Sequence, residues 1–150
     1  MPTKVKISID DHKELRLILD TIFDMKTPIQ VVRYGVLLAQ HIQELTDTPS
    51  NQMITNGYLM NEAWQNKKAK LRDVRKASFQ IHELAKSSKD PLLQAVYRVI
   101  GHGIASAHVK EHAMVASDYA ILAINHLYPN DVQEVVKERK FQIELLEKIE

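Results

Sequence analysis

The sequence lacks several features that would assign its class directly. It has no cysteine, which excludes a disulfide framework, a thiolate nucleophile and a cysteine-ligated zinc site, and fits a reducing, cytoplasmic location. Only four glycines are present, too few for a collagen-like or glycine-rich chain. No stretch reaches the roughly 20 apolar residues of a membrane span, and the N-terminus has no apolar signal-peptide core. We therefore expect neither membrane insertion nor export.

The chain also lacks an excess of charge of either sign. Lys and Arg together number 20 and Asp and Glu 19, which leaves a formal net charge of +1. Because no overall field favours a polyanion, we do not expect nucleic acid as a partner. A length of 150 residues with 45% hydrophobic residues is typical of one compact domain that spans residues 1–150.

Apolar residues recur with helical periodicity along most of the chain, and capping residues mark where helices begin. A capping-box pattern at Ser8 predicts the first start, and Thr27-Pro28, Thr48-Pro49 and Asp90-Pro91 predict three more. Only residues 4–9 alternate with period two, so residues 1–8 are predicted to be an extended lead-in. The fold class is all-α, a single-domain bundle of six or seven helices, with predicted helices over residues 8–26, 28–46, 49–66, 70–88, 91–108, 111–128 and 130–149.

Histidines fall on three successive predicted helices together with other polar side chains. If the helix faces meet, they form a half-buried polar cluster for binding or for structure, composed of Arg75, His82, His102, His108, His112 and Tyr119. Gly101 and Gly103 lie inside the same region, and a helical glycine costs about 1 kcal/mol relative to alanine. We therefore expect another helix to pack closely against these two glycines.

A metal site is the alternative interpretation of the histidines. His108 and His112 have the i, i+4 spacing that can bind one metal ion, with a third ligand from His102, His82 or His41. Together with Glu111 they spell the H-x-x-E-H string of inverted zinc proteases. That motif needs an uninterrupted helix, whereas a break is predicted near Val109-Lys110. No serine with a matched base or paired acid and base carboxylates can be assigned.

Charged residues elsewhere are predicted to lie on solvated helix faces. Positive charge concentrates between residues 67 and 76, the one place where an acidic partner or nucleic acid would be attracted. Glu111 and Asp118 are expected on the solvated side of their helix. The charged last helix, residues 130–149, is expected to pair its Glu, Lys and Arg residues at i, i+3 or i, i+4.

The central segment resembles an all-helical family of bacterial immunity proteins, the immunity-five-like domain, over about residues 62–128, and the last helix lies outside the resemblance. Its motifs are Arg75-Lys76-Ala77 followed by His82, Ala85-Lys86, Ala95 before Gly101-His102, Ala107-His108-Val109, His112-Ala113 and Asp118-Tyr119-Ala120. The resemblance implies a non-catalytic cytoplasmic protein of a polymorphic toxin system that binds a cognate protein toxin and neutralises it.

Two hypotheses from different classes follow. Under the first, the chain is an immunity protein without a cofactor. Under the second, it is a metal-dependent helical-bundle enzyme or metal-binding protein, in which His102, His108 and His112 hold a divalent ion. A homo-oligomer is compatible with either hypothesis.

Overall fold

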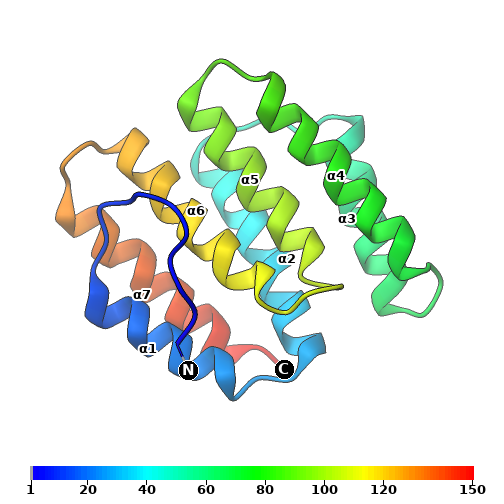
Figure 1. The fold of residues 1–150 in the computed structure, drawn as a ribbon, viewed down its shortest axis with the longest axis horizontal. Coiled ribbons are helices and arrows are strands. Elements are labelled where there is room, and N and C mark those ends of the chain that lie inside the picture. The colour runs from blue at the N-terminus through cyan, green and yellow to red at the C-terminus, as the bar shows by residue number, and fades with distance from the viewer. Residues whose placement is uncertain (1) are drawn as a thin grey trace.

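Seven α-helices follow one another in this computed structural model, which describes residues 2–150. They are α1 (Lys13–Asp24), α2 (Pro28–Leu45), α3 (Gln52–Gln65), α4 (Leu71–Ser87), α5 (Pro91–Ala105), α6 (His112–Leu127) and α7 (Val132–Lys148). No strand occurs between residues 2 and 150, so the predicted all-α fold is confirmed. None of the described helices is both long and apolar enough to cross a membrane. The helices pack into one domain (Figure 1).

Two of the predicted helix starts have the predicted capping contacts. At the start of α2, the hydroxyl of Thr27 accepts from the backbone N–H of Gln30, and the side-chain oxygen of Gln30 accepts from the backbone N–H of Thr27. At the start of α5, the Asp90 carboxylate accepts from the backbone N–H of Leu92 at 3.0 Å. These contacts satisfy backbone donors that have no partner within the helix.

Two predicted helix starts are wrong. The first helix is capped by His12 rather than Ser8, since the His12 ring accepts a hydrogen bond from the backbone N–H of Leu15 at 3.2 Å. Residues 9–12 stay non-helical, and the backbone of Asp10 is hydrogen-bonded in both directions to the side chain of Asn125 on α6. The third helix is capped by Asn51. Thr48 lies before it, where its hydroxyl is hydrogen-bonded within the turn that follows α2.

The core forms where α2, α5 and α6 pack together. Leu38, Ile100 and Ala120 are fully buried there. Helices α2 and α5 approach closely at two glycines: a Cβ built on Gly103 would lie 2.5 Å from the carbonyl oxygen of Gly35, and one built on Gly35 would lie 2.8 Å from that of Gly103. Any side chain on either residue would therefore collide with the backbone of the opposite helix.

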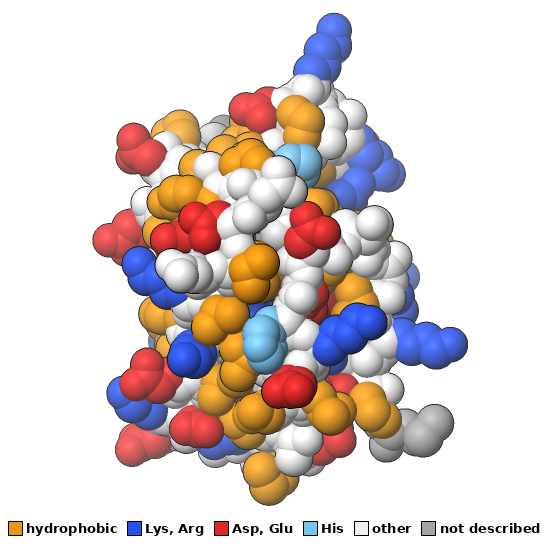
Figure 2. All heavy atoms as spheres, turned by 90° about the vertical axis from the view of Figure 1, so that its left-hand side faces the viewer, with side chains coloured by type: hydrophobic (Ala, Val, Ile, Leu, Met, Phe, Trp, Pro, Cys, Tyr) orange, Lys and Arg blue, Asp and Glu red, His pale blue; other side chains and the backbone are white. Residues whose placement is uncertain are grey.

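Helices α1 and α7 lie side by side against α6, and the lead-in crosses α6 on its way to α1 (Figure 1). Helix α1 does not bury a purely apolar face, because Ile18 is 47% exposed while Arg16 and Asp20 are buried. The face that this end of the molecule presents mixes acidic, basic and apolar side chains (Figure 2). Such mixing agrees with the near-zero net charge.

Candidate functional site

Four histidines from α4, α5, the α5–α6 connection and the start of α6 form a continuous series of ring contacts, and we call His82, His102, His108 and His112 the histidine cluster. Ring centroids are 4.5 Å apart between His82 and His102, 5.1 Å between His102 and His112, and 5.2 Å between His108 and His112. Tyr119, two turns after His112, stacks on His102 at 5.4 Å with only 11° between the ring planes. The structure thus joins three helices through consecutive ring contacts.

Hydrogen bonds fix the orientation of three of these rings. The Nδ1 atoms of His102 and His112 are 2.8 Å apart, so one ring donates to the other. Arg98 donates from Nη1 to Nδ1 of His82 at 2.8 Å, which places the proton of the neutral His82 ring on Nε2, since a guanidinium has no acceptor. Arg98 was missed by the sequence prediction. It lies one helical turn before His102, and this i, i+4 spacing was the available signal.

Burial keeps the histidine cluster neutral at pH 7. Burial, reinforced by the charge of Arg98, lowers the pKa of His82 from 6.5 to about 4. Burial and the neighbouring His82 and His112 lower the pKa of His102 to about 2. The pKa values of His108 and His112 are also lowered, again first by burial. Protonation of a ring in the cluster is unfavourable, because the positive charge would be poorly solvated and close to other hydrogen-bond donors.

Gly101 leaves the space that the His82 ring occupies. A Cβ on Gly101 would come within 2.7 Å of Cε1 and 2.8 Å of Nε2 of this ring. The glycine inside α5 therefore lets an imidazole from α4 lie directly on the α5 backbone. Gly103, two residues further along α5, packs instead against α2. The two helical glycines therefore contact different helices.

His108 and Arg75 lie at the outer end of the cluster, where it opens to the surface. Nδ1 of His108 is buried without a hydrogen-bond partner among the described residues. The Arg75 guanidinium lies over the ring of Phe79, 5.3 Å from its centroid. These residues line a surface groove of about 560 Å³, which we call the basic groove and which is formed by Leu71, Arg72, Arg75, Phe79, His108, Val109 and His112.

The histidines are arranged for hydrogen bonding among themselves. Two ligand nitrogens on one tetrahedral zinc ion are about 3.3 Å apart when each Zn–N bond is about 2.0 Å, whereas His102 and His112 Nδ1 are 2.8 Å apart. Within residues 2–150 no three His, Cys, Asp or Glu side chains are grouped to hold a metal ion. His41 lies elsewhere, hydrogen-bonded to Glu138 at 2.7 Å. The H-x-x-E-H string is broken as predicted, because α6 begins only at its last residue.

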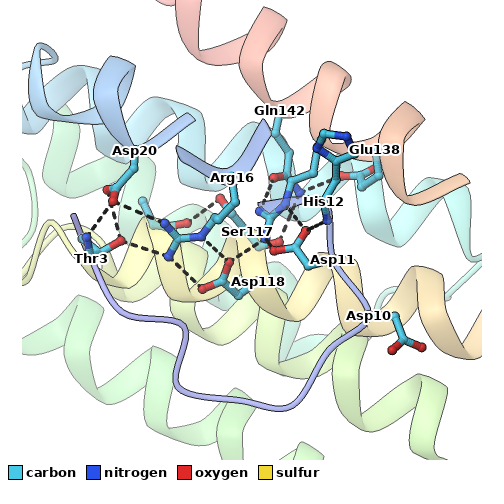
Figure 3. Close-up of polar contacts among 12 residues, drawn as sticks. Thr3, Asp10, Asp11, His12, Arg16, Asp20, Ser117, Asp118, Glu138 and Gln142 are labelled. Carbon is cyan, nitrogen blue, oxygen red and sulfur yellow. Dashed lines mark hydrogen bonds and ion pairs between the residues drawn. The ribbon is translucent and has the colours of Figure 1, made fainter. Parts of the chain in front are cut away.

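A second polar cluster was not predicted and lies between α1, α6 and α7 (Figure 3). Arg16 donates from Nε and Nη2 to the two carboxylate oxygens of Asp118, at 2.8 and 3.1 Å. Arg139 donates to both oxygens of Asp11, at 2.9 and 2.8 Å, and from Nη2 to Asp118 at 2.8 Å. Asp20 is 3.5 Å from Arg16 and receives the backbone N–H of Thr3 from the lead-in. We call Asp11, Arg16, Asp20, Asp118 and Arg139 the ion network.

The ion network corrects the expectation that these charges lie in solvent. Asp118 is 2% exposed and Arg139 is fully buried, as is Gln142, which accepts from Arg139 and donates to Glu138. Burial alone would lower the pKa of Arg139, but its hydrogen bond to Asp11 and the charge of Asp118 raise it. Of the two carboxylates predicted to be solvated on α6, only Glu111 is exposed.

A comparison with known families decides the assignment. The sequence matches the family described as Imm-5 like putative immunity protein over residues 22–149. The chain belongs to this family. The match extends well beyond residues 62–128, and it includes the last helix, which the resemblance had left outside. No significant match was found among curated proteins or among solved structures.

The part of the chain matched to the immunity protein family contains the whole histidine cluster and the whole basic groove. It contains the ion network only in part, because Asp11, Arg16 and Asp20 precede residue 22. The features that fall wholly inside the family match are therefore those at the junction of α4, α5 and α6.

Proposed function

We propose that this chain is a bacterial immunity protein that binds a cognate protein toxin in the cytoplasm and neutralises it without catalysing a reaction. The observation that carries the proposal is the family match over residues 22–149, which covers all but the first part of the helical domain. Charge and hydropathy are compatible with it, since the chain has a formal net charge of +1 and its described helices include none that could cross a membrane.

The contacts of the serine hydroxyls support the non-catalytic part of the proposal. Ser78, Ser106 and Ser117 each donate to a backbone carbonyl of their own helix, at 2.8, 2.6 and 2.8 Å. An activated serine instead donates to a general base. Within the histidine cluster, His82, His102 and His112 are hydrogen-bonded to Arg98 or to one another rather than to a serine. Neutralisation by binding needs neither a nucleophile nor a cofactor.

The test uses the toxin domain encoded by a large coding sequence next to the gene. We expect co-expression of this chain to rescue cells from that domain, and the two purified proteins to form a stable complex. Residual toxin activity should fall linearly and reach zero at one equivalent of this chain, because a binding inhibitor acts stoichiometrically. Dialysis of the chain against a chelator should leave the titration unchanged.

Three results would contradict the proposal. A neighbouring metabolic operon without a toxin gene would count against it, and so would a toxin domain that neither binds nor is neutralised. Inactivation of many equivalents of toxin by one equivalent of this chain would show turnover. In that case, dependence of the turnover on added zinc or manganese would favour the metal-dependent alternative.

A further inference from the structure

The basic groove exposes apolar side chains on an otherwise well-packed part of the molecule. It lies between the first half of α4 and the α5–α6 connection (Figure 1). Leu71 is 40% exposed, Phe79 53% and Val109 44%. Single exposed apolar residues are ordinary, but three that line one concavity form a surface that a partner can desolvate.

Positive charge lines the same groove. Neither Arg72 nor Arg75 forms an ion pair with any described residue between 2 and 150. The lysines nearest in sequence, Lys67, Lys68, Lys70 and Lys76, are all exposed. No carboxylate lines the groove. Asp73 accepts from the backbone N–H of Lys70 at the start of α4, and the exposed Glu111, next to His112 in sequence, is the nearest acidic residue on the α5–α6 connection. The groove thus carries charge of one sign, whereas the face shown in Figure 2 carries both acidic and basic side chains.

Arginine and aromatic side chains are both enriched at protein interfaces, and arginine is among the residues that contribute most binding energy. Stacking on Phe79 orders the Arg75 guanidinium before any partner arrives, so less side-chain entropy is lost on binding. Guanidinium groups also match carboxylates geometrically, through two parallel hydrogen bonds. Neutral His108 and His112 add uncharged hydrogen-bonding groups to the groove wall.

We propose that the basic groove is the toxin-binding surface, and that it takes an acidic segment of the toxin that carries an apolar side chain. This inference rests on the proposed function. The apolar side chain packs between Leu71, Phe79 and Val109, while neighbouring carboxylates pair with Arg72 and Arg75. A protein segment fits better than nucleic acid, because a sugar–phosphate backbone has no apolar side chain to cover Leu71, Phe79 and Val109, and the whole chain carries almost no net charge.

The test measures the affinity of the same toxin domain for groove variants by isothermal titration calorimetry. Arg75→Glu and Phe79→Ala should each weaken binding at least about tenfold, as central arginine and aromatic residues of interfaces do. Two matched controls lie elsewhere on the surface: Lys140→Glu on α7 reverses a charge, and Leu59→Ala on α3 removes an exposed apolar side chain. Both controls should bind within about twofold of the wild type. Equal thermal unfolding midpoints would show that all four variants are folded.

Each outcome decides between the two proposals. If the wild type binds and the groove variants lose affinity while the controls do not, the groove is the contact surface. If the wild type binds and Arg75→Glu and Phe79→Ala bind equally well, the groove assignment is overturned and the immunity function stands. If the wild type does not bind, the proposed function fails and this inference fails with it. Displacement of the toxin domain by a single-stranded oligonucleotide, with loss of oligonucleotide binding in Arg75→Glu, would reassign the groove to nucleic acid.

Discussion

Asp118 receives hydrogen bonds from both buried guanidinium groups, Arg16 and Arg139. Replacing it with asparagine keeps the shape but removes one of the two carboxylates beside each arginine, the others being Asp20 for Arg16 and Asp11 for Arg139. Removal of one partner of a buried ion pair typically costs about 3–5 kcal/mol, because the remaining charges stay desolvated. We expect Asp118→Asn to lower the free energy of unfolding in urea by that amount.

The control for this prediction is a carboxylate in an exposed pair. Glu144 lies 3.4 Å from Lys148, and both side chains are largely exposed. Because exposed pairs contribute about 0–1 kcal/mol, Glu144→Gln should leave the free energy of unfolding nearly unchanged. A loss below about 1 kcal/mol in Asp118→Asn would mean that the ion network adds little net stability.

The histidine cluster predicts how stability depends on pH. In the folded protein the pKa of His82 is about 4 and that of His102 about 2, whereas both are near 6.5 when unfolded. Between about pH 6.5 and about pH 4 the unfolded chain therefore binds more protons, so stability rises with pH in this window and is lost as the pH falls. We expect the unfolding midpoint to drop steadily across it, measured by circular dichroism.

Replacing both rings with a side chain that does not titrate isolates their contribution. The double variant His82→Gln, His102→Gln should have a shallower dependence of stability on pH between about 6.5 and about 4, even if it is less stable overall. An unchanged slope would show that other groups cause the acid destabilisation. Poor packing of glutamine would lower the stability at every pH, but it would not change how steeply the stability depends on pH.

At the scale of helices, the contact between α2 and α5 depends on two glycines. In Gly103→Ala the new Cβ would meet the backbone oxygen of Gly35, which cannot move without shifting a helix. Overpacking of this kind costs about 1–3 kcal/mol, and we expect the upper end of that range in urea unfolding. In Gly57→Ala the Cβ would meet only the terminal methyl groups of Ile104 and Ile81, which can rotate away.

Gly57→Ala is therefore the matched control. The gain in helix propensity, about 1 kcal/mol, offsets the small repacking, so its stability should stay within about 1 kcal/mol of the wild type. If Gly103→Ala is equally well tolerated, the two helices can separate at low cost. The close approach would then not be a requirement of the fold.

Element boundaries could be predicted where a local signal exists, as at Thr27 and Asp90, whose capping contacts involve residues two or three positions away. The ion network could not be predicted in this way, because Asp11 and Arg139 are 128 positions apart. A local signal was nevertheless present in α7. Arg139 and Gln142 continue the helical stripe of its buried apolar residues, and charge alone does not place a residue in solvent.

The histidine cluster was easier to predict than the ion network for a physical reason. Residues seven positions apart share a helix face whatever the tertiary structure, so the spacing of His112 and Tyr119 already placed them on the same side of their helix. In the structure Tyr119 stacks on His102. The packing of His82 against α5 depends on the space left by Gly101. The sequence alone does not show which side chain fills the space beside a glycine.

At the scale of the whole molecule, α6 connects the two polar clusters. Two adjacent residues of this helix contact different clusters: Asp118 joins the ion network with α1 and α7, and Tyr119 stacks on the histidine cluster with α4 and α5. One hydrophobic core also extends from Leu19 of α1 and Leu146 of α7 to Ile54 of α3. A smaller cluster of Ile121, Ile124 and Val135 lies between α6 and α7. Because each of the seven helices also contributes buried residues to the main core, the domain should unfold as one unit.

The single tryptophan tests this expectation, since Trp64 packs on the core from α3, far along the chain from the ion network. In Arg139→Met, an ion-network variant, the loss of about 3–5 kcal/mol should lower the thermal midpoint by about 10 °C, because 1 kcal/mol corresponds to about 2–4 °C at this size. Trp64 fluorescence and far-UV circular dichroism should report the same lowered midpoint, and exposed Lys140→Met should change neither. If the fluorescence midpoint stays at its wild-type value while the circular dichroism midpoint falls, α1 and α7 unfold independently of the helices that carry the basic groove.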